Sequence, residues 1–70
     1  MEYKRFRAQN QGFQFLIEAD KSDVGAYLYV FKGAITEDYL EDSVEKCQKR
    51  ALQHFGVPLD AWKPIKSVFV

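Results

Sequence analysis

The 70-residue sequence predicts an α+β fold: a three-stranded antiparallel meander, one long helix packed on one face of the sheet, and a C-terminal fourth strand (β-β-β-α-β). Three observations lead to this prediction. The first half of the chain alternates apolar and polar residues in short segments separated by turn formers. Residues 36–58 repeat apolar residues at helical spacing, and a β-branched and aromatic segment follows them. The length predicts a single domain, residues 1–70.

The predicted strands of the meander are Tyr3–Gln9, Phe13–Ala19 and Val24–Phe31. Residues 10–12 and 20–23 separate them, and both segments are rich in Asn, Gly, Asp and Ser, which favour turns. Consecutive strands joined by such short turns predict antiparallel hairpins.

The register of the hairpins follows from their turns. A first turn at Asn10 and Gln11 places Phe6 opposite Phe15, and a second turn centred on residues 21–22 continues the same pattern. One face then collects apolar side chains, which we expect the helix to cover. These residues are Phe6, Ala8, Phe13, Phe15, Ile17, Ala19, Val24, Ala26, Leu28 and Val30.

The opposite face is also partly apolar, and we predict that it binds a partner. It carries Arg5, Arg7, Gln14, Leu16, Tyr27, Tyr29 and Phe31. The third predicted strand is apolar on both sides, yet the sequence provides only one long helix to cover it. Three candidates could cover this second face: the segment after the helix, a second copy of the chain, or a ligand that binds aromatic and guanidinium groups.

The helix is predicted within residues 36–58, with both ends marked. Thr36 can cap the N-terminus, while Gly56 followed by Val57 and Pro58 ends the run. Acidic residues in the first half and basic residues in the second suit the helix dipole. The apolar stripe of this helix is Leu40, Val44, Cys47, Ala51 and Phe55.

The end of the sequence predicts a turn and a strand. Asp60–Trp62 reads as a short turn in which Trp62 closes one edge of the core. Pro64 leads into Ile65–Val70, a predicted strand. Because a crossover helix precedes it, we expect this strand to run parallel to the strand it joins, beside either the first or the third.

The stretch HFGVPLDAWKPI, with the helix before it, resembles small bacterial proteins of unknown function. Those proteins end a helix on phenylalanine, glycine, valine and proline and then place a tryptophan. The resemblance covers about half of the chain. It implies no activity, so it assigns a functional role to no residue.

Composition narrows the classes of function. Ten basic and ten acidic residues give a net charge of zero, which disfavours general affinity for nucleic acid or anionic membranes. The single cysteine cannot form an internal disulfide, and we interpret it as evidence for a reducing compartment. No apolar run reaches the length of a membrane span or a signal peptide, so a cytoplasmic protein without a membrane partner is expected.

The sequence offers little to carry catalysis. A cysteine nucleophile activated by a histidine base would have to be Cys47 with His54, because the chain has one of each. On one helix these two residues lie about 10 Å apart along its axis, too far for a hydrogen bond. One Cys and one His do not make a zinc site, and the scattered glycines form no phosphate-binding loop. We therefore predict a non-enzymatic protein without a cofactor.

The leading functional hypothesis is a protein-binding or homodimerising module that uses the aromatic sheet face. The alternative is single-stranded nucleic-acid binding on the same face, because aromatic rings edged by Arg5 and Arg7 can stack splayed bases. The chain lacks the second helix, the glycine-bearing aromatic signature and the basic excess of the common RNA-binding sheet. Protein binding is therefore the favoured interpretation.

Overall fold

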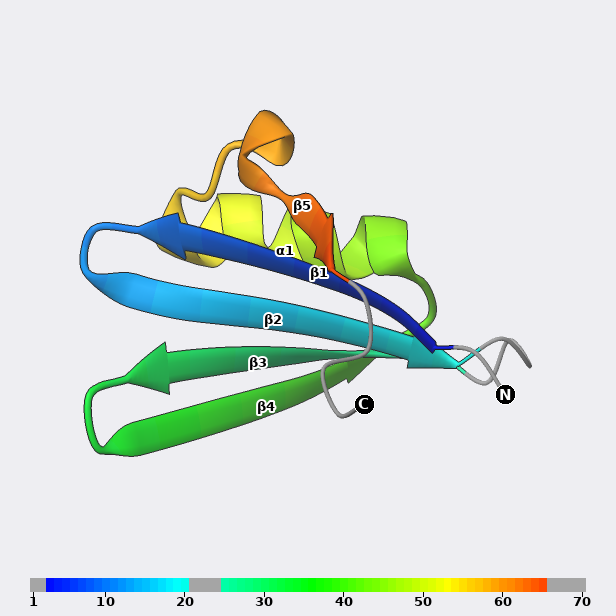
Figure 1. The fold of residues 1–70 in the computed structure, drawn as a ribbon, viewed down its shortest axis with the longest axis horizontal. Coiled ribbons are helices and arrows are strands. Elements are labelled where there is room, and N and C mark those ends of the chain that lie inside the picture. The colour runs from blue at the N-terminus through cyan, green and yellow to red at the C-terminus, as the bar shows by residue number, and fades with distance from the viewer. Residues whose placement is uncertain (1–2, 21–24, 66–70) are drawn as a thin grey trace.

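The computed structural model describes residues 3–20 and 25–65, which form an antiparallel sheet of five strands and one helix (Figure 1). The predicted α+β class is confirmed, whereas the number and order of strands differ from the predicted meander. The elements are β1 (Tyr3–Asn10), β2 (Phe13–Asp20), β3 (Ala26–Lys32), β4 (Ile35–Glu41), α1 (Val44–Phe55), the 3₁₀ turn η1 (Leu59–Ala61) and β5 (Lys63–Ile65).

The strands lie side by side in the order β4-β3-β2-β1-β5, and α1 crosses one face of the sheet (Figure 1). The last strand pairs with β1 and is antiparallel to it, so the predicted parallel pairing is wrong. The reason is β4, which the sequence analysis missed. After a crossover helix, the next strand runs in the same direction as the strand before the helix. That strand is β4, which is antiparallel to β3, and not the third strand as predicted, so β5 runs opposite to the expected direction.

The first hairpin turns at Gln11 and Gly12, one residue later than predicted. Both have positive φ angles, 53° and 84°, which is the backbone pattern of a type I′ hairpin turn. Phe6 consequently lies opposite Ile17 rather than Phe15. The β2–β3 pairing is shifted by the same two positions, with Phe15 opposite Val30. A shift of two leaves every side chain on its predicted face.

Residues 35–41 form strand β4, so the predicted helix start at Thr36 is wrong. The helix begins after Ser43, whose Oγ accepts a hydrogen bond from the backbone N–H of Lys46 at 3.2 Å. Leu40 leaves the predicted helix stripe and is 60% exposed on β4. Pairing with β3 along its whole length gives this segment backbone hydrogen bonds with a neighbouring strand, which its local apolar spacing did not reveal.

The helix ends where the sequence predicts. Gly56 adopts a left-handed conformation with φ 71°. Its N–H donates to the Leu52 carbonyl and the N–H of Val57 donates to the Ala51 carbonyl, the two bonds of a Schellman motif. Of the predicted stripe, Cys47 and Ala51 are fully buried.

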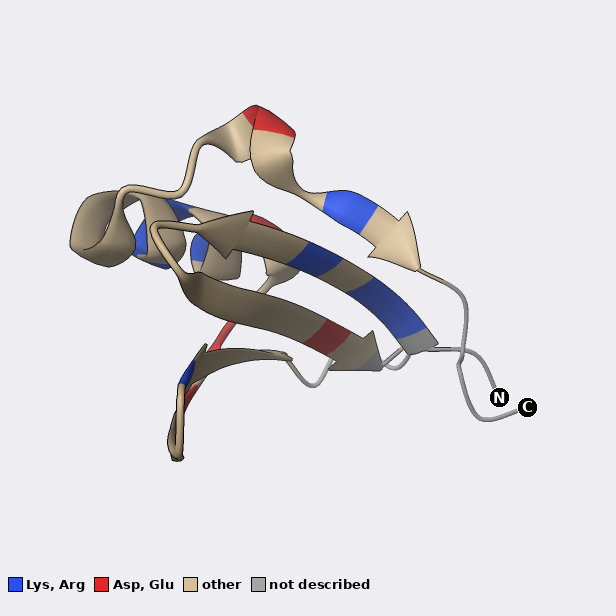
Figure 2. Ribbon diagram, turned by 60° about the vertical axis from the view of Figure 1, so that its left-hand side comes forward, with Lys and Arg blue, Asp and Glu red and all other residues tan. Residues whose placement is uncertain are grey.

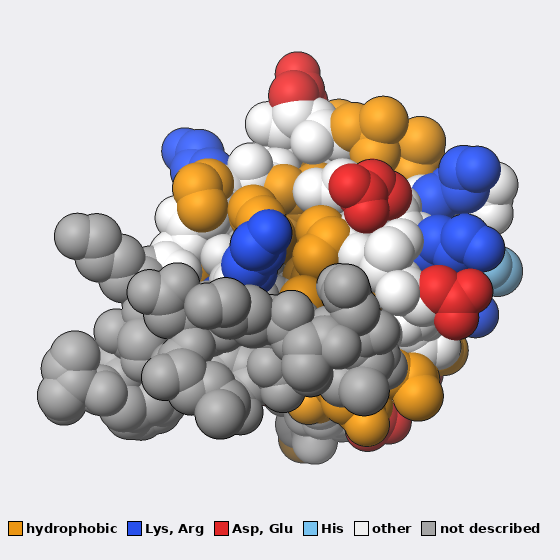
Figure 3. Space-filling model, turned by 90° about the vertical axis from the view of Figure 1, so that its right-hand side faces the viewer, with side chains coloured by type: hydrophobic (Ala, Val, Ile, Leu, Met, Phe, Trp, Pro, Cys, Tyr) orange, Lys and Arg blue, Asp and Glu red, His pale blue; other side chains and the backbone are white. Residues whose placement is uncertain are grey.

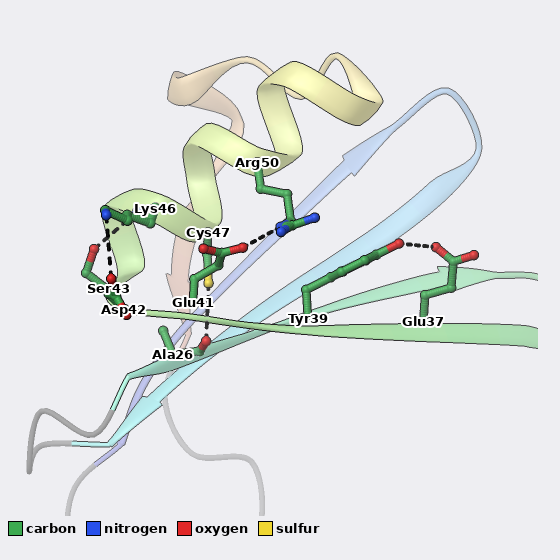
Figure 4. Close-up of polar contacts among 9 residues, drawn as sticks. All are labelled: Ala26, Glu37, Tyr39, Glu41, Asp42, Ser43, Lys46, Cys47 and Arg50. Atoms are coloured by element: carbon green, nitrogen blue, oxygen red, sulfur yellow. Dashed lines mark hydrogen bonds and ion pairs between the residues drawn. The ribbon is translucent and has the colours of Figure 1, made fainter.

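Polar contacts fix the helix to β4 (Figure 4). Arg50 Nε donates to Glu41 Oε2 at 2.5 Å, and the Arg50 guanidinium lies 4.7 Å from the centre of the Tyr39 ring. The Tyr39 hydroxyl in turn donates to Glu37 at 2.6 Å. Glu37, Tyr39 and Glu41 occupy alternate positions of β4 and point toward α1 (Figure 4). The odd-numbered positions of β4 therefore belong to the helix-covered face.

The core lies between the sheet and α1. The ring of Phe15 packs 5.5 Å from that of Phe55 and 6.3 Å from that of Trp62, measured between ring centres. Trp62 is buried at the edge of the core as predicted, although its indole Nε1 has no hydrogen-bond partner among the described residues. The predicted strand Ile65–Val70 is described only at its first residue, because residues 66–70 lie outside the described part.

Candidate functional site

The sheet face opposite α1, called the outer face here, carries all seven residues that the sequence analysis assigned to partner binding. The strand pairings place them in three adjacent strands: Arg5 and Arg7 on β1, Gln14 and Leu16 on β2, and Tyr27, Tyr29 and Phe31 on β3. Their neighbours in sequence point into the core, as alternation along a strand requires. The prediction that these residues share one face depended on the register, and the shift by two positions preserves it.

Three aromatic rings form a stripe along the outer face of β3. The centres of the Tyr27 and Tyr29 rings lie 6.0 Å apart, those of Tyr29 and Phe31 lie 6.5 Å apart, and both pairs are tilted by only 22°. Tyr27 is 43% exposed and Phe31 is 38% exposed. The stripe therefore presents stacked ring surfaces to the solvent from a strand in the interior of the sheet.

The structure adds residues that the sequence analysis did not assign to this face. Leu40, Asp38 and Thr36 of β4 lie opposite the three aromatic residues, and Ile65 and Lys63 of β5 lie opposite the two arginines. The strand-forming residues Ile35, Thr36 and Tyr39 are the local signal that could have indicated the additional strand, although apolar and polar residues do not alternate over 35–41. The outer face is thus wider than predicted.

Charges on the outer face are separated across the strands. The basic residues Arg5 and Arg7 lie on β1 and Lys63 lies on β5, whereas the acidic Asp38 lies on β4 at the other edge; Figure 2 shows the charged positions along these strands. Arg5 donates to Glu18 at 2.7 Å on the neighbouring strand, which neutralises one basic position. Arg7 and Lys63 are exposed at the basic edge and Asp38 at the acidic one.

Partial burial raises the pKa of the Tyr29 hydroxyl above its ordinary value of 10.0, and the nearby charges of Glu18 and Asp38 act in the same direction. Tyr29 is therefore neutral at physiological pH, and its hydroxyl is available as a hydrogen-bond donor. A neutral phenol with an apolar ring suits a surface that loses its water upon binding.

The single cysteine, Cys47, lies in the core, away from the outer face. Cys47 is fully buried, and its Sγ donates to the carbonyl oxygen of Ala26 at 3.5 Å. Burial raises the pKa of this thiol to about 11, with a smaller contribution from Glu41. A neutral and inaccessible thiol is a poor nucleophile, so Cys47 acts as a packing residue.

The helix presents a different polar surface. Basic side chains gather on the helical side of the molecule together with the histidine (Figure 3). A shallow hollow on this side is lined by Glu41, Lys46, Lys49, Arg50, Gln53 and His54. Within the described residues, no three His, Cys, Asp or Glu side chains come together in a way that could hold a metal ion.

Comparisons of the chain with protein-family models, with curated proteins and with solved structures found no match. The resemblance based on the FGVP and tryptophan segment therefore stays an expectation. In the part of the chain that the structure describes, no helix is long and apolar enough to cross a membrane.

Proposed function

We propose that this chain is a non-enzymatic protein-interaction module that binds another polypeptide through the outer face. The observation that carries the proposal is the exposed aromatic stripe on a sheet whose helix covers the other side. Exposed aromatic surface of this kind is typical of interaction sites. The proposal extends to homodimerisation, because a second copy is the simplest polypeptide partner.

The composition of the outer face supports a protein partner. Tyr, Phe and Arg are enriched in the cores of protein interfaces, and the face contains each of them. The aromatic side chains are held by a strand with neighbours on both sides, so ordering them on binding costs little conformational entropy. A small domain also gains stability from a partner that binds only the folded state.

The absence of an activated nucleophile from the described surface supports a non-enzymatic role. Cys47 is buried, and the pKa of its thiol is raised. The acidic residues of β4 that face the helix already form ion pairs or hydrogen bonds within the fold. Glu41 pairs with Arg50, and Glu37 accepts hydrogen bonds from Tyr39 and Lys32. These contacts stabilise the fold, so the presence of the two carboxylates needs no catalytic role.

Site-specific photocrosslinking tests the proposal. A photoreactive phenylalanine analogue at Tyr27 or Phe31 should form covalent adducts with a polypeptide in cells, and mass spectrometry should locate the crosslink on the outer face. The same analogue at Gln53, an exposed helix position, is the matched control. Absence of polypeptide adducts at both outer-face positions, or equal adducts at the control, would contradict the proposal.

Single-stranded nucleic acid is the second candidate, and one observation favours it. Arg7 and Lys63 are paired neighbours and lie in the same cross-strand row as the ring of Tyr29. Oligonucleotide should then quench tyrosine and tryptophan fluorescence at low salt, and an Arg5→Ala, Arg7→Ala double variant should lose this effect. Asp38 and Glu18 on the same face weigh against this candidate because they repel phosphates.

A further inference from the structure

The outer face consists of three rows of side chains that run across the strands. Strand pairing aligns the residues of each row. Two rows extend from β4 at one edge to β5 at the other, and the third ends at β1 and consists of Thr36, Phe31, Gln14 and Gln9. The central row reads Asp38, Tyr29, Leu16, Arg7 and Lys63. The row beside it reads Leu40, Tyr27, Glu18, Arg5 and Ile65.

The central row is complementary to its own reverse. Leu16 is its midpoint, with an aromatic residue and an acid on one side and two basic residues on the other. Reversing the row places acid against base and the tyrosine against an arginine. Such self-complementarity is what a two-fold symmetric interface requires, because both subunits use the same surface.

We infer that the polypeptide bound by the outer face is a second copy of this chain, related by a two-fold axis parallel to the strands and passing close to Leu16. This inference rests on the proposed function and names its partner. Asp38 then lies against Lys63 of the partner subunit, and Tyr29 lies against Arg7 of the partner subunit. The two Leu16 side chains meet at the axis.

The second row fits the same arrangement. Leu40, which is 60% exposed, lies against Ile65 of the partner subunit, so an apolar contact covers it. Tyr27 lies against Arg5 of the partner subunit, an arrangement that allows guanidinium stacking on the ring. Glu18 meets its own copy, but each Glu18 is already neutralised by Arg5 at 2.7 Å.

Charge distinguishes this arrangement from the other two-fold packing of the two faces. An axis running across the strands would place Asp38 on Asp38 and Arg7 on Arg7, so like charges would meet at both edges. Like charges that face each other lower affinity and reject the wrong arrangement. Both axes keep the strands of the two sheets roughly aligned, the common geometry of packed sheets, so charge alone decides between them.

The size of the face sets the expected affinity. Strands about 4.8 Å apart and rows about 6.8 Å apart give a contact of roughly 400 Å² on each subunit. The two subunits together would bury roughly 800 Å², which is less than a standard specific interface and typical of weak, transient ones, so we expect a reversible dimer with a Kd on the order of 10 µM or weaker. The measurement therefore needs concentrations from about 1 µM to about 1 mM.

Sedimentation equilibrium combined with charge exchange tests the inference. The wild-type chain should change from its monomer mass of 8.2 kDa to twice that mass as concentration rises. Asp38→Lys and Lys63→Glu should each raise the Kd about tenfold or more, because each change makes two like-charged contacts in the symmetric dimer. Glu45→Lys, an exposed helix position, is the matched control and should leave the Kd unchanged.

Mixing the two variants gives the sharpest result. In a heterodimer of D38K with K63E every edge contact again joins opposite charges, so an equimolar mixture should dimerise with the wild-type Kd. Circular dichroism and thermal melting should show that each variant alone is folded. A wild-type monomer at all concentrations, or a mixture as weak as its components, would overturn the inference. Crosslinks to a different protein in that case would leave the proposed function intact, whereas the absence of any outer-face crosslink would remove both.

Discussion

The two faces of the sheet are built from the same strands, yet they have opposite surroundings. On the helix-covered face, Ile17, Leu28 and Val30 are completely buried. On the outer face of the same strands, the aromatic stripe remains partly exposed, with Tyr27 at 43%. The comparison shows that strand propensity and burial are separate properties. Strong strand formers occupy both faces of β3, but only one face receives the helix.

Polar groups also behave differently on the two faces. Near α1 they are fixed: Arg50 binds Glu41, and Asn10 donates to the carbonyl oxygen of Phe55 at 3.0 Å. On the outer face, exposed charges are instead distributed by strand, with Asp38 at one edge and Lys63 at the other. The first pattern stabilises one fold, and the second provides a surface that a charged partner can recognise.

The largest expected difference comes from one substitution made on each face. Leu28→Ala should lower the free energy of unfolding by about 2–5 kcal/mol, because it leaves a cavity in a fully buried site. Leu40→Ala should lower it by less than about 1 kcal/mol, since that side chain is 60% exposed. Urea denaturation of the two variants at low protein concentration makes the comparison. Equal losses would contradict the assignment of Leu40 to the outer face.

The pH dependence of stability tests the buried thiol on the helix-covered side. The ordinary pKa of the Cys47 thiol is 9.0, and burial raises it to about 11 in the folded state. The unfolded chain therefore ionises first, so the stabilisation is complete below pH 9 and is lost as pH rises toward 11. Between these values wild type should lose about 2–3 kcal/mol more than Cys47→Ala.

Chemical denaturation at a series of pH values measures this difference. The raised pKa values of Tyr29 and Tyr39 contribute to the alkaline loss in both proteins, so only the difference between wild type and variant reports on Cys47. Identical pH profiles would show that the thiol ionises as readily in the folded state as in the unfolded chain.

The smallest expected effect locates the start of the helix. Ser43→Ala should cost about 1 kcal/mol, because it removes the hydroxyl that accepts from the N–H of Lys46. Thr36→Ala should cost less than about 0.5 kcal/mol, since Thr36 is an exposed residue of β4 and caps no helix. Thermal melting distinguishes them. A larger loss at Thr36 than at Ser43 would support the helix start that the sequence suggested.

Much of the candidate site could be predicted because side-chain alternation depends only on the strand period. The pairing registers of the two hairpins each differ from the prediction by two positions, which kept Tyr27, Tyr29 and Phe31 on the predicted face. The contributions of Asp38 and Lys63 could not be predicted in the same way, because they depend on strands at the edges of the sheet. Lys63 pairs with Arg7, which is far away in the sequence and leaves little local signal, whereas Asp38 belongs to a hairpin strand that the sequence analysis assigned to the helix.

The sequence by itself determined the first three strands, the two faces of the meander and the end of the helix at Gly56, because alternation and capping act over a few residues. Only the tertiary structure decided that residues 35–41 form a strand and not a helix. Their apolar spacing permits a helix, but β3 supplies a neighbouring strand to which their backbone groups bond. That choice reversed the direction of the final strand and placed acidic and basic edges on opposite sides of one face.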